Sequence, residues 1–240
     1  MKIVEKFKAK ASSNIDNPPV TIAFLGDSVT QGCFELYVKP SNTMATVFDK
    51  NNVYHNYIAK IFTVLYPTVP VNMINAGISG TTAAIGLERL ERDVLTHNPD
   101  LVVVCFGLND SRAGEAGINE YSAAIDGIIK KLTDAGKEVI FMTPNMLNTD
   151  ISPHIKEKLI LETAEELMEI QNSGLMDKYM AAAKGVCEKY GVKVCDCYEK
   201  WKQLYACGVN VTELLSNKVN HPAREMHWLF ASMLVDTMLS

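Results

Sequence analysis

The residues with the clearest chemical potential stand in four short segments of the chain. The first is Gly26-Asp27-Ser28, which directly follows the apolar run Val20–Leu25. A serine at the end of a strand can meet a ligand, and neighbouring backbone N–H groups can point at a developing oxyanion. Ser28 is therefore a candidate nucleophile. Taken alone, the tripeptide is more often an ordinary turn in which Asp27 or Ser28 caps a helix.

Two further segments follow the next two apolar runs. Gly80 has no side chain, so its backbone N–H can approach a ligand closely, while Thr81 or Thr82 could cap the helix that follows. Asn109 offers a neutral amide donor, which can stabilise an oxyanion at any pH. Each segment alone is also typical of an ordinary connection or turn.

The fourth segment is Asn220–His227, near the carboxyl terminus. Pro222 in a first helical turn would fix the start of the last helix and leave His221 in the preceding loop, where an imidazole can reach other loops. His227 falls inside the predicted helix, and we expect it to pack in the core or lie on the surface. A lone histidine is more often structural, so this segment matters through its combination with the other three.

The hydrophobic pattern predicts a scaffold that brings these segments together. Short apolar runs alternate with longer amphipathic ones, which is typical of a parallel sheet covered by helices on both faces. The predicted strands are Val20–Leu25, Val69–Ile74, Leu101–Phe106, Glu138–Met142 and Val192–Cys195, and the predicted helices lie near Tyr54–Tyr66, Thr82–Thr96, Asn119–Ala135, Leu175–Tyr190 and Ala223–Leu239. This is an α/β fold, a three-layer α/β/α sandwich with a five-stranded parallel sheet. Its carboxyl edge would gather all four segments.

Two stretches do not fit the alternation. Gln31–Asn52 carries few helix or strand signals, and Pro144–Gln171 begins as a loop before a charged helical segment from about Lys156. Both follow the carboxyl ends of strands, where open α/β sheets place ligands, so we expect them to set substrate choice. Three aromatic residues of the first stretch could line a pocket or pack in the core: Phe34, Tyr37 and Phe48.

Length and composition limit the class of protein. The chain has 240 residues, of which 48% are hydrophobic and 21% charged, as in ordinary globular proteins. No linker or repeat divides it, so we expect an N-terminal extension over residues 1–19 and a single domain over residues 20–240. The net charge of -5 argues against nucleic acid as a partner, and no apolar stretch approaches the ~20 residues of a membrane span. Six cysteines and no recognisable export signal predict a cytoplasmic protein.

In combination, the four segments resemble the SGNH (GDSL) hydrolase family, which comprises esterases and acylhydrolases with a flavodoxin-like sandwich. The resemblance runs from Gly26 to the last helix. The family's blocks are matched by Gly26-Asp27-Ser28, by Gly80 and by Gly107-Leu108-Asn109-Asp110. The resemblance implies that Ser28 is the nucleophile and His221 the base. It further implies an oxyanion hole formed by the backbone N–H groups of Ser28 and Gly80 and the Asn109 side chain, with Asp27, Gly107 and Asp110 in support.

One position departs from the family's pattern. The family commonly has an aspartate three residues before its histidine, and Lys218 stands there in this chain. A backbone carbonyl could orient the imidazole instead, or a carboxylate elsewhere, such as Glu213 or Glu225. We therefore predict a Ser28–His221 dyad and leave the acid unassigned.

The predicted function is a serine esterase that hydrolyses a small O-acyl ester through an acyl-enzyme, with acetyl groups on carbohydrates as the substrate that the resemblance favours. The alternatives are a lysophospholipase or thioesterase of the same family, or a flavodoxin-like binding module that has lost hydrolysis. We expect no nucleotide cofactor and no metal, because nucleotide-binding glycine motifs and Cys-x-x-Cys pairs are absent. Arg112 could contact a charged substrate group, and Cys33 could be accessible near the nucleophile. The oligomeric state is not predicted.

Overall fold

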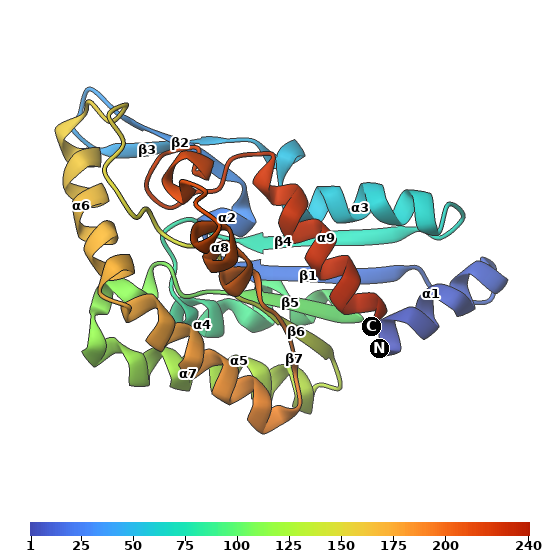
Figure 1. The fold of residues 1–240 in the computed structure, drawn as a ribbon. Coiled ribbons are helices and arrows are strands. Elements are labelled where there is room, and N and C mark those ends of the chain that lie inside the picture. Colours follow the sequence, from blue (N-terminus) through green and yellow to red (C-terminus); the bar gives the residue numbers. More distant parts are fainter.

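A central parallel sheet organises the chain, which the computed structural model describes over residues 1–240. Its strands are β1 (Val20–Gly26), β4 (Val71–Gly77), β5 (Leu101–Cys105), β6 (Glu138–Met142) and β7 (Lys193–Cys195), in the order β4-β1-β5-β6-β7. All neighbouring strands are parallel. In Figure 1 the arrowheads of β4 and β1 point toward the end of the sheet that carries the short helix α2 (Ser28–Gln31). The order reverses between β1 and β5, and open α/β sheets bind ligands beside such a reversal.

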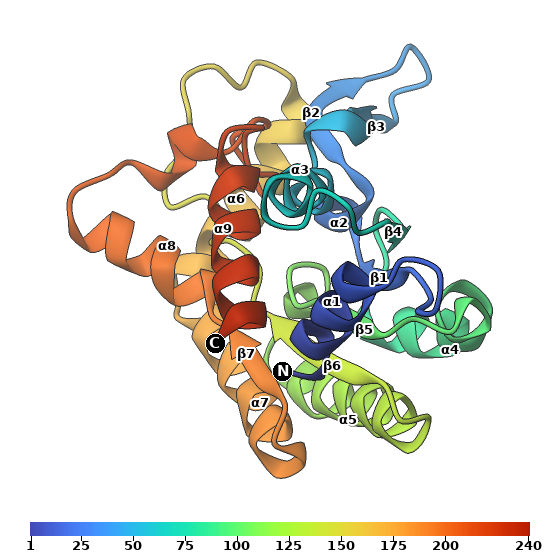
Figure 2. The same ribbon diagram turned by 90° about the vertical axis from the view of Figure 1, so that its right-hand side faces the viewer.

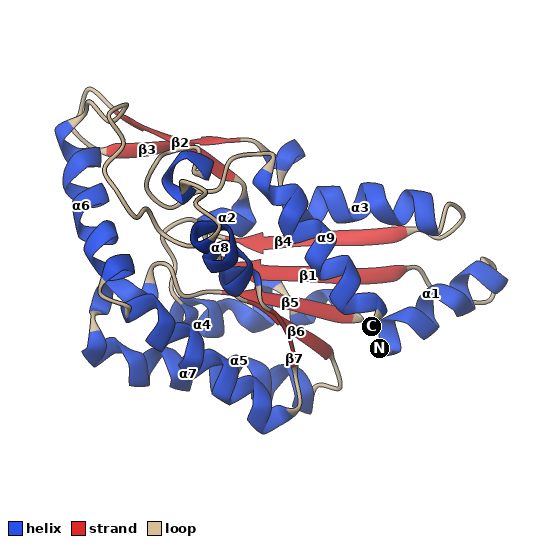
Figure 3. Ribbon diagram, in the orientation of Figure 1, coloured by secondary structure: helices blue, strands red, loops and turns tan.

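Helices cover both faces of the sheet (Figure 2). One face carries α1 (Lys2–Ser12), α3 (Tyr54–Leu65) and α9 (Met226–Leu239), and the other carries α4 (Ala83–Asp93), α5 (Ile118–Asp134) and α7 (Leu175–Tyr190). Two more helices are α6 (Lys158–Asn172) and α8 (Cys197–Ala206), and short turns of 3-10 helix lie at Lys50–Asn52, Leu95–His97, Asp110–Ala113, Glu115–Gly117 and Val211–Leu214. Figure 3 shows the red strands of the sheet flanked by blue helices. The three-layer α/β/α sandwich predicted from the sequence is therefore confirmed.

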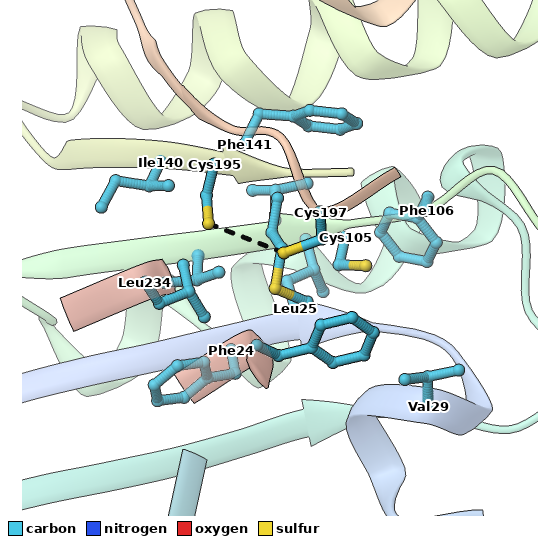
Figure 4. Packing of buried hydrophobic residues seen from close by; sticks show 14 of the residues in the cluster. Phe24, Leu25, Val29, Cys105, Phe106, Ile140, Phe141, Cys195, Cys197 and Leu234 are labelled. Atoms are coloured by element: carbon cyan, nitrogen blue, oxygen red, sulfur yellow. Dashed lines mark hydrogen bonds between the residues drawn. The ribbon is translucent and has the colours of Figure 1, made fainter. Parts of the chain in front are cut away.

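The core lies between the sheet and its helices. Every residue of β5 is buried, as expected for a central strand with helices on both faces. Figure 4 shows Phe24 and Leu25 of β1 packed among the thiols of Cys105, Cys195 and Cys197. Burial at this density holds the carboxyl ends of the strands in fixed register, so loops that leave them start from rigid positions.

Three local predictions were wrong. Residues 31–52 contain an antiparallel hairpin of β2 (Cys33–Val38) and β3 (Met44–Phe48), which stands apart from the main sheet. Cys195 and Cys197, two residues apart, were both expected on the last strand, but Cys197 begins helix α8, because Asp196 caps that helix by accepting from the Glu199 backbone N–H. The last helix begins at Met226 and not near Ala223, whose N–H donates to the Leu214 carbonyl instead.

The N-terminal segment forms a helix that packs on the domain. In α1, Ile3 and Phe7 are buried in the common core, and the carboxylate of Glu138 accepts hydrogen bonds from the backbone N–H groups of Lys2 and Ile3. The division of the chain at residue 19 stays a prediction. None of the helices combines the length and the apolar character needed to cross a bilayer.

Candidate active site

Ser28 lies at the carboxyl end of β1, as the first residue of α2. The turn needs glycine at position 26, because an added Cβ there would lie 2.1 Å from Thr30 Oγ1 and 2.9 Å from the Cys105 carbonyl oxygen. The Asp27 carboxylate accepts from the Val29 N–H at 3.0 Å and so caps α2. As the first residue of a helix, Ser28 has a backbone N–H without a partner inside the helix, and this N–H can bind a ligand.

His221 joins Ser28 in a hydrogen-bonded chain. Its Nε2 lies 3.0 Å from Ser28 Oγ, and its Nδ1 lies 2.8 Å from the backbone carbonyl oxygen of Phe34. A carbonyl can only accept, so Nδ1 must carry the proton and Nε2 is left with a free lone pair. The serine hydroxyl donates to that lone pair, which is the arrangement required for a general base.

The structure answers the question of what orients the imidazole. The Lys218 ammonium lies 2.9 Å from a carboxylate oxygen of Glu213 and donates to the Glu213 backbone carbonyl. No carboxylate hydrogen-bonds His221, so neither Glu213 nor Glu225 takes the place of the family's aspartate. Of the alternatives that the sequence left open, the backbone carbonyl is the one present, and it belongs to Phe34.

Burial sets the charge state of the histidine. His221 is 4% exposed, and this burial lowers the pKa of its imidazole from 6.5 to about 4, an effect that the hydrogen bond to Phe34 only partly opposes. The neutral base is therefore the dominant form near pH 7. A carboxylate partner would favour the imidazolium and raise the pKa of His221. An uncharged carbonyl in that place does so less, which agrees with the lowered pKa.

Asn217 builds the loop that presents His221. Its Oδ1 accepts from the backbone N–H groups of Val219, Asn220 and His221 at 2.9–3.0 Å. The His221 carbonyl in turn accepts from the Ser216 N–H at 2.7 Å. One asparagine thus closes a tight turn that fixes the imidazole, a role that the sequence analysis missed although Asn in such a segment is a common turn residue.

Gly80 and Asn109 both lie near the N-terminus of α4, which begins at Ala83. Gly80 has a φ of 77°, and a Cβ there would meet no protein atom within 4 Å, so backbone conformation and not crowding by the protein requires glycine. The Asn109 Nδ2 donates to the Thr81 carbonyl at 2.9 Å, which leaves its second N–H available. Neither threonine caps α4 through its side chain. Asp110 does so instead, by accepting from the Ala83 N–H at 2.8 Å.

Other buried residues support the loops that carry Ser28, Gly80 and Asn109. Gly107 has a φ of 136°, and a Cβ there would lie 2.5 Å from Met180 Cε. Burial raises the pKa of Asp27 to about 7 and that of Asp110 to about 6. Arg89, which carries no motif that marks it in the sequence, is 6% exposed and donates to the carbonyls of Gly26 and Ala76 at 2.7 and 2.6 Å. It ties together the ends of β1 and β4, from which Ser28 and Gly80 extend.

A pocket of about 570 Å³ opens above these residues, a size typical of small-molecule sites. Its floor includes Ser28, Gly80, Asn109 and His221. The hairpin and α6 form most of its walls, with Leu36, Tyr37, Lys39, Met44, Ala45, Thr46, Phe48, Thr163 and Leu167. The two stretches expected to shape the site therefore do line it. Tyr37 and Phe48 reach the pocket, whereas Phe34 is fully buried.

The other singled-out residues have structural surroundings. His227 is buried and accepts from the Tyr54 N–H at 3.2 Å, as expected for a packing histidine. Cys33 is buried, which contradicts the expected accessibility. Arg112 lines the pocket but is held by Glu166 through hydrogen bonds of 2.7 and 2.8 Å. No group of three or more His, Cys, Asp or Glu side chains is arranged to hold a metal ion.

The chain belongs to the GDSL-like Lipase/Acylhydrolase family, whose pattern it matches over residues 24–229. It is 26% identical over 132 residues to an acetylxylan esterase from Geobacillus stearothermophilus, a match that covers 51% of this chain and 58% of that protein.

Two solved structures share the fold. A catalytic mutant of an acetylxylan esterase from Geobacillus stearothermophilus superposes with a TM-score of 0.67 at 19% identity, covering 91% of this chain and 94% of the other. A two-domain esterase active on acetylated mannans gives a TM-score of 0.66 at 20% identity. That match covers 98% of this chain but 52% of the larger protein, so the chain spans about half of it.

Proposed function

We propose that this protein is a serine esterase that removes acetyl groups from a carbohydrate through an acyl-enzyme. The observation that carries the proposal is the continuous hydrogen-bonded chain from Ser28 through His221 to the Phe34 carbonyl, with 3.0 and 2.8 Å between its atoms, at the floor of a pocket. A surface turn or a structural histidine needs no such alignment. These three hydrogen-bonded groups correspond to the nucleophile, the base and the orienting group that covalent catalysis requires.

The reaction follows from these positions. As Ser28 Oγ attacks the ester carbonyl carbon, its proton moves to His221 Nε2, and the carbonyl oxygen gains the negative charge. Collapse of this intermediate breaks the bond to the sugar oxygen, which takes the proton from Nε2 and leaves as an alcohol. Water then loses a proton to Nε2 while attacking the acetyl-enzyme. The second intermediate collapses as Ser28 Oγ takes the proton from Nε2, and acetic acid leaves and ionises to acetate in the solvent.

Three donors would stabilise the oxyanion. They are the backbone N–H groups of Ser28 and Gly80 and the free Nδ2 hydrogen of Asn109. The Gly80 N–H makes no hydrogen bond to the protein, and the Ser28 N–H has no acceptor inside its helix. Donors that are already fixed in place need no reorganisation during the reaction, and each would lower the barrier by ~3 kcal/mol.

The substrate class is supported by the relatives and by the pocket. The similar proteins named above act on acetylated xylan and mannans. In this chain, Tyr37 and Phe48 are 47% and 53% exposed at the pocket wall, where flat aromatic surfaces could contact a sugar ring. The Ser28–His221 geometry favours an enzyme over a binding module.

The test is acetate release from acetylated xylo- and manno-oligosaccharides by the wild-type protein beside Ser28→Ala. We expect release by the wild type alone, with lysophospholipids and acyl thioesters hydrolysed more slowly. Equal release by the two proteins would remove Ser28 from the mechanism. Faster hydrolysis of a lysophospholipid or thioester would reject the carbohydrate substrate while keeping the esterase chemistry.

A further inference from the structure

Arg224 links the histidine loop to the hairpin that supplies the orienting carbonyl. It lies three residues after His221, and its guanidinium contacts both carboxylate oxygens of Glu35 at 2.5 and 3.1 Å. Its Nε donates to Asp49 Oδ2 at 2.8 Å. Glu35 is on β2 and Asp49 follows β3, so one side chain holds both strands of the hairpin.

The residue between these contacts is Phe34. Its ring lies under the Arg224 guanidinium, 4.3 Å from ring centroid to Cζ, and packs against His227 at 5.1 Å between ring centroids. Its backbone carbonyl accepts a hydrogen bond from His221 Nδ1, and the carboxylate of the next residue, Glu35, accepts hydrogen bonds from Arg224. Arg224 therefore contacts both the Phe34 ring and the carboxylate of the adjacent Glu35.

This attachment matters because the hairpin does not belong to the main sheet. β2 and β3 pair only with each other, and Val47 and Phe48 of β3 are 40% and 53% exposed. A triad aspartate attracts an imidazolium through its full charge, whereas a carbonyl depends on a short, aligned hydrogen bond. Phe34 itself is fully buried, but outside the main sheet no strand ladder fixes the direction of its carbonyl, so side-chain contacts must set its alignment with the imidazole.

We propose that Arg224, together with Glu35 and Asp49, is a positioning residue that clamps the Phe34 carbonyl against His221 and so replaces the triad aspartate in function. The proposal rests on the proposed Ser28–His221 chemistry. This role requires arginine, because the planar guanidinium bonds both carboxylates and stacks on the Phe34 ring, whereas a lysine ammonium cannot do both with the same geometry.

A purely structural ion pair predicts something different. Arg224 is about one-third exposed, and an exposed ion pair contributes little to stability and does not affect a reaction step. The clamp instead predicts a loss in turnover with little change in substrate binding, because Arg224 does not line the pocket.

The experiment compares Arg224→Gln, Arg224→Lys and Glu35→Gln with the wild type in hydrolysis of a chromogenic acetate ester. We expect kcat to fall at least about tenfold in Arg224→Gln with a nearly unchanged KM, since small misplacements of reacting groups are costly. Arg224→Lys should recover part of the loss. Glu35→Gln removes one arm of the clamp and should give a smaller loss of the same kind, even if Arg224→Gln folds poorly.

The matched control is Arg92→Gln. Arg92 makes a comparable fork to Asp93, with hydrogen bonds of 2.6 and 3.0 Å, but its side chain is 73% exposed on α4. Its loss should leave kcat unchanged. A similar fall in kcat in this control would show that the losses at Arg224 reflect general stability and would overturn the clamp.

A second readout reports the hydrogen bond itself. With isotopically labelled histidine, the Nδ1 proton of His221 should give a slowly exchanging low-field signal, assigned by its absence in His221→Gln. We expect Arg224→Gln to lose or broaden this signal. Retention of both the signal and kcat would overturn the clamp while leaving the esterase proposal intact. An inactive wild type would reject the proposed function, and the signal alone would then decide whether the clamp exists.

Discussion

Replacement of Asn109 by alanine separates transition-state stabilisation from substrate binding. In the free protein, one hydrogen of the Asn109 amide is taken by the Thr81 carbonyl at 2.9 Å, so the other is held toward the pocket. This hydrogen would meet a full negative charge only in the transition state. We therefore expect kcat to fall by about 10²–10³-fold and KM to change by less than about threefold.

The assay is steady-state hydrolysis of a chromogenic acetate ester, with thermal unfolding as the folding control. Loss of the hydrogen bond to Thr81 should cost ~1 kcal/mol, which lowers the melting temperature by roughly 2–4 °C in a chain of this size. Asn109→Asp has nearly the same shape but places a negative charge near the oxyanion, so it should be slower still. A rise in KM with an unchanged kcat in Asn109→Ala would refute a place for this residue in the oxyanion hole.

Three further predictions follow from the site. Because burial lowers the pKa of His221 to about 4, kcat/KM should stay level well below pH 6.5 and fall only near pH 4, and an acid limb at pH 6.5 in a pH–rate profile would contradict the neutral buried base. Gly80→Ala forces a side chain into a φ of 77° at a cost of ~1–2 kcal/mol, so unfolding curves should show destabilisation and kinetics a lower kcat. Gly26→Ala would place Cβ 2.1 Å from Thr30 Oγ1, and little folded protein by circular dichroism is expected.

The main sheet could be predicted because its strands are marked by strong local signals. The run Leu101–Phe106 is uniformly apolar, as a strand buried on both faces must be, and the structure ends it one residue earlier at Cys105. The hairpin escaped prediction because Cys33–Val38 and Met44–Phe48 are short and mostly apolar, so they lack the regular polar–apolar alternation that marks a strand with one exposed face. The hairpin is stabilised by contacts with helices and loops that are distant in the sequence, and a local sequence pattern does not show such contacts.

The site was predictable wherever a side chain carries the chemistry. Ser28, Asn109 and His221 stand out by residue type and by their places after strands or before a helix, and the fold brings them together. The orienting group was not predictable, because it is a backbone carbonyl and any residue has one. Phe34 gives no chemical signal in the sequence, and only the fold places it 2.8 Å from the imidazole.

The claim that Ser28 is an activated nucleophile is tested most directly by covalent labelling with a serine-directed fluorophosphonate. We expect one equivalent of label, located on Ser28 by peptide mass spectrometry, with no labelling of Ser28→Ala and greatly slowed labelling of His221→Gln. Labelling of Ser28→Ala to the same extent, or no labelling of a folded wild-type protein, would contradict it.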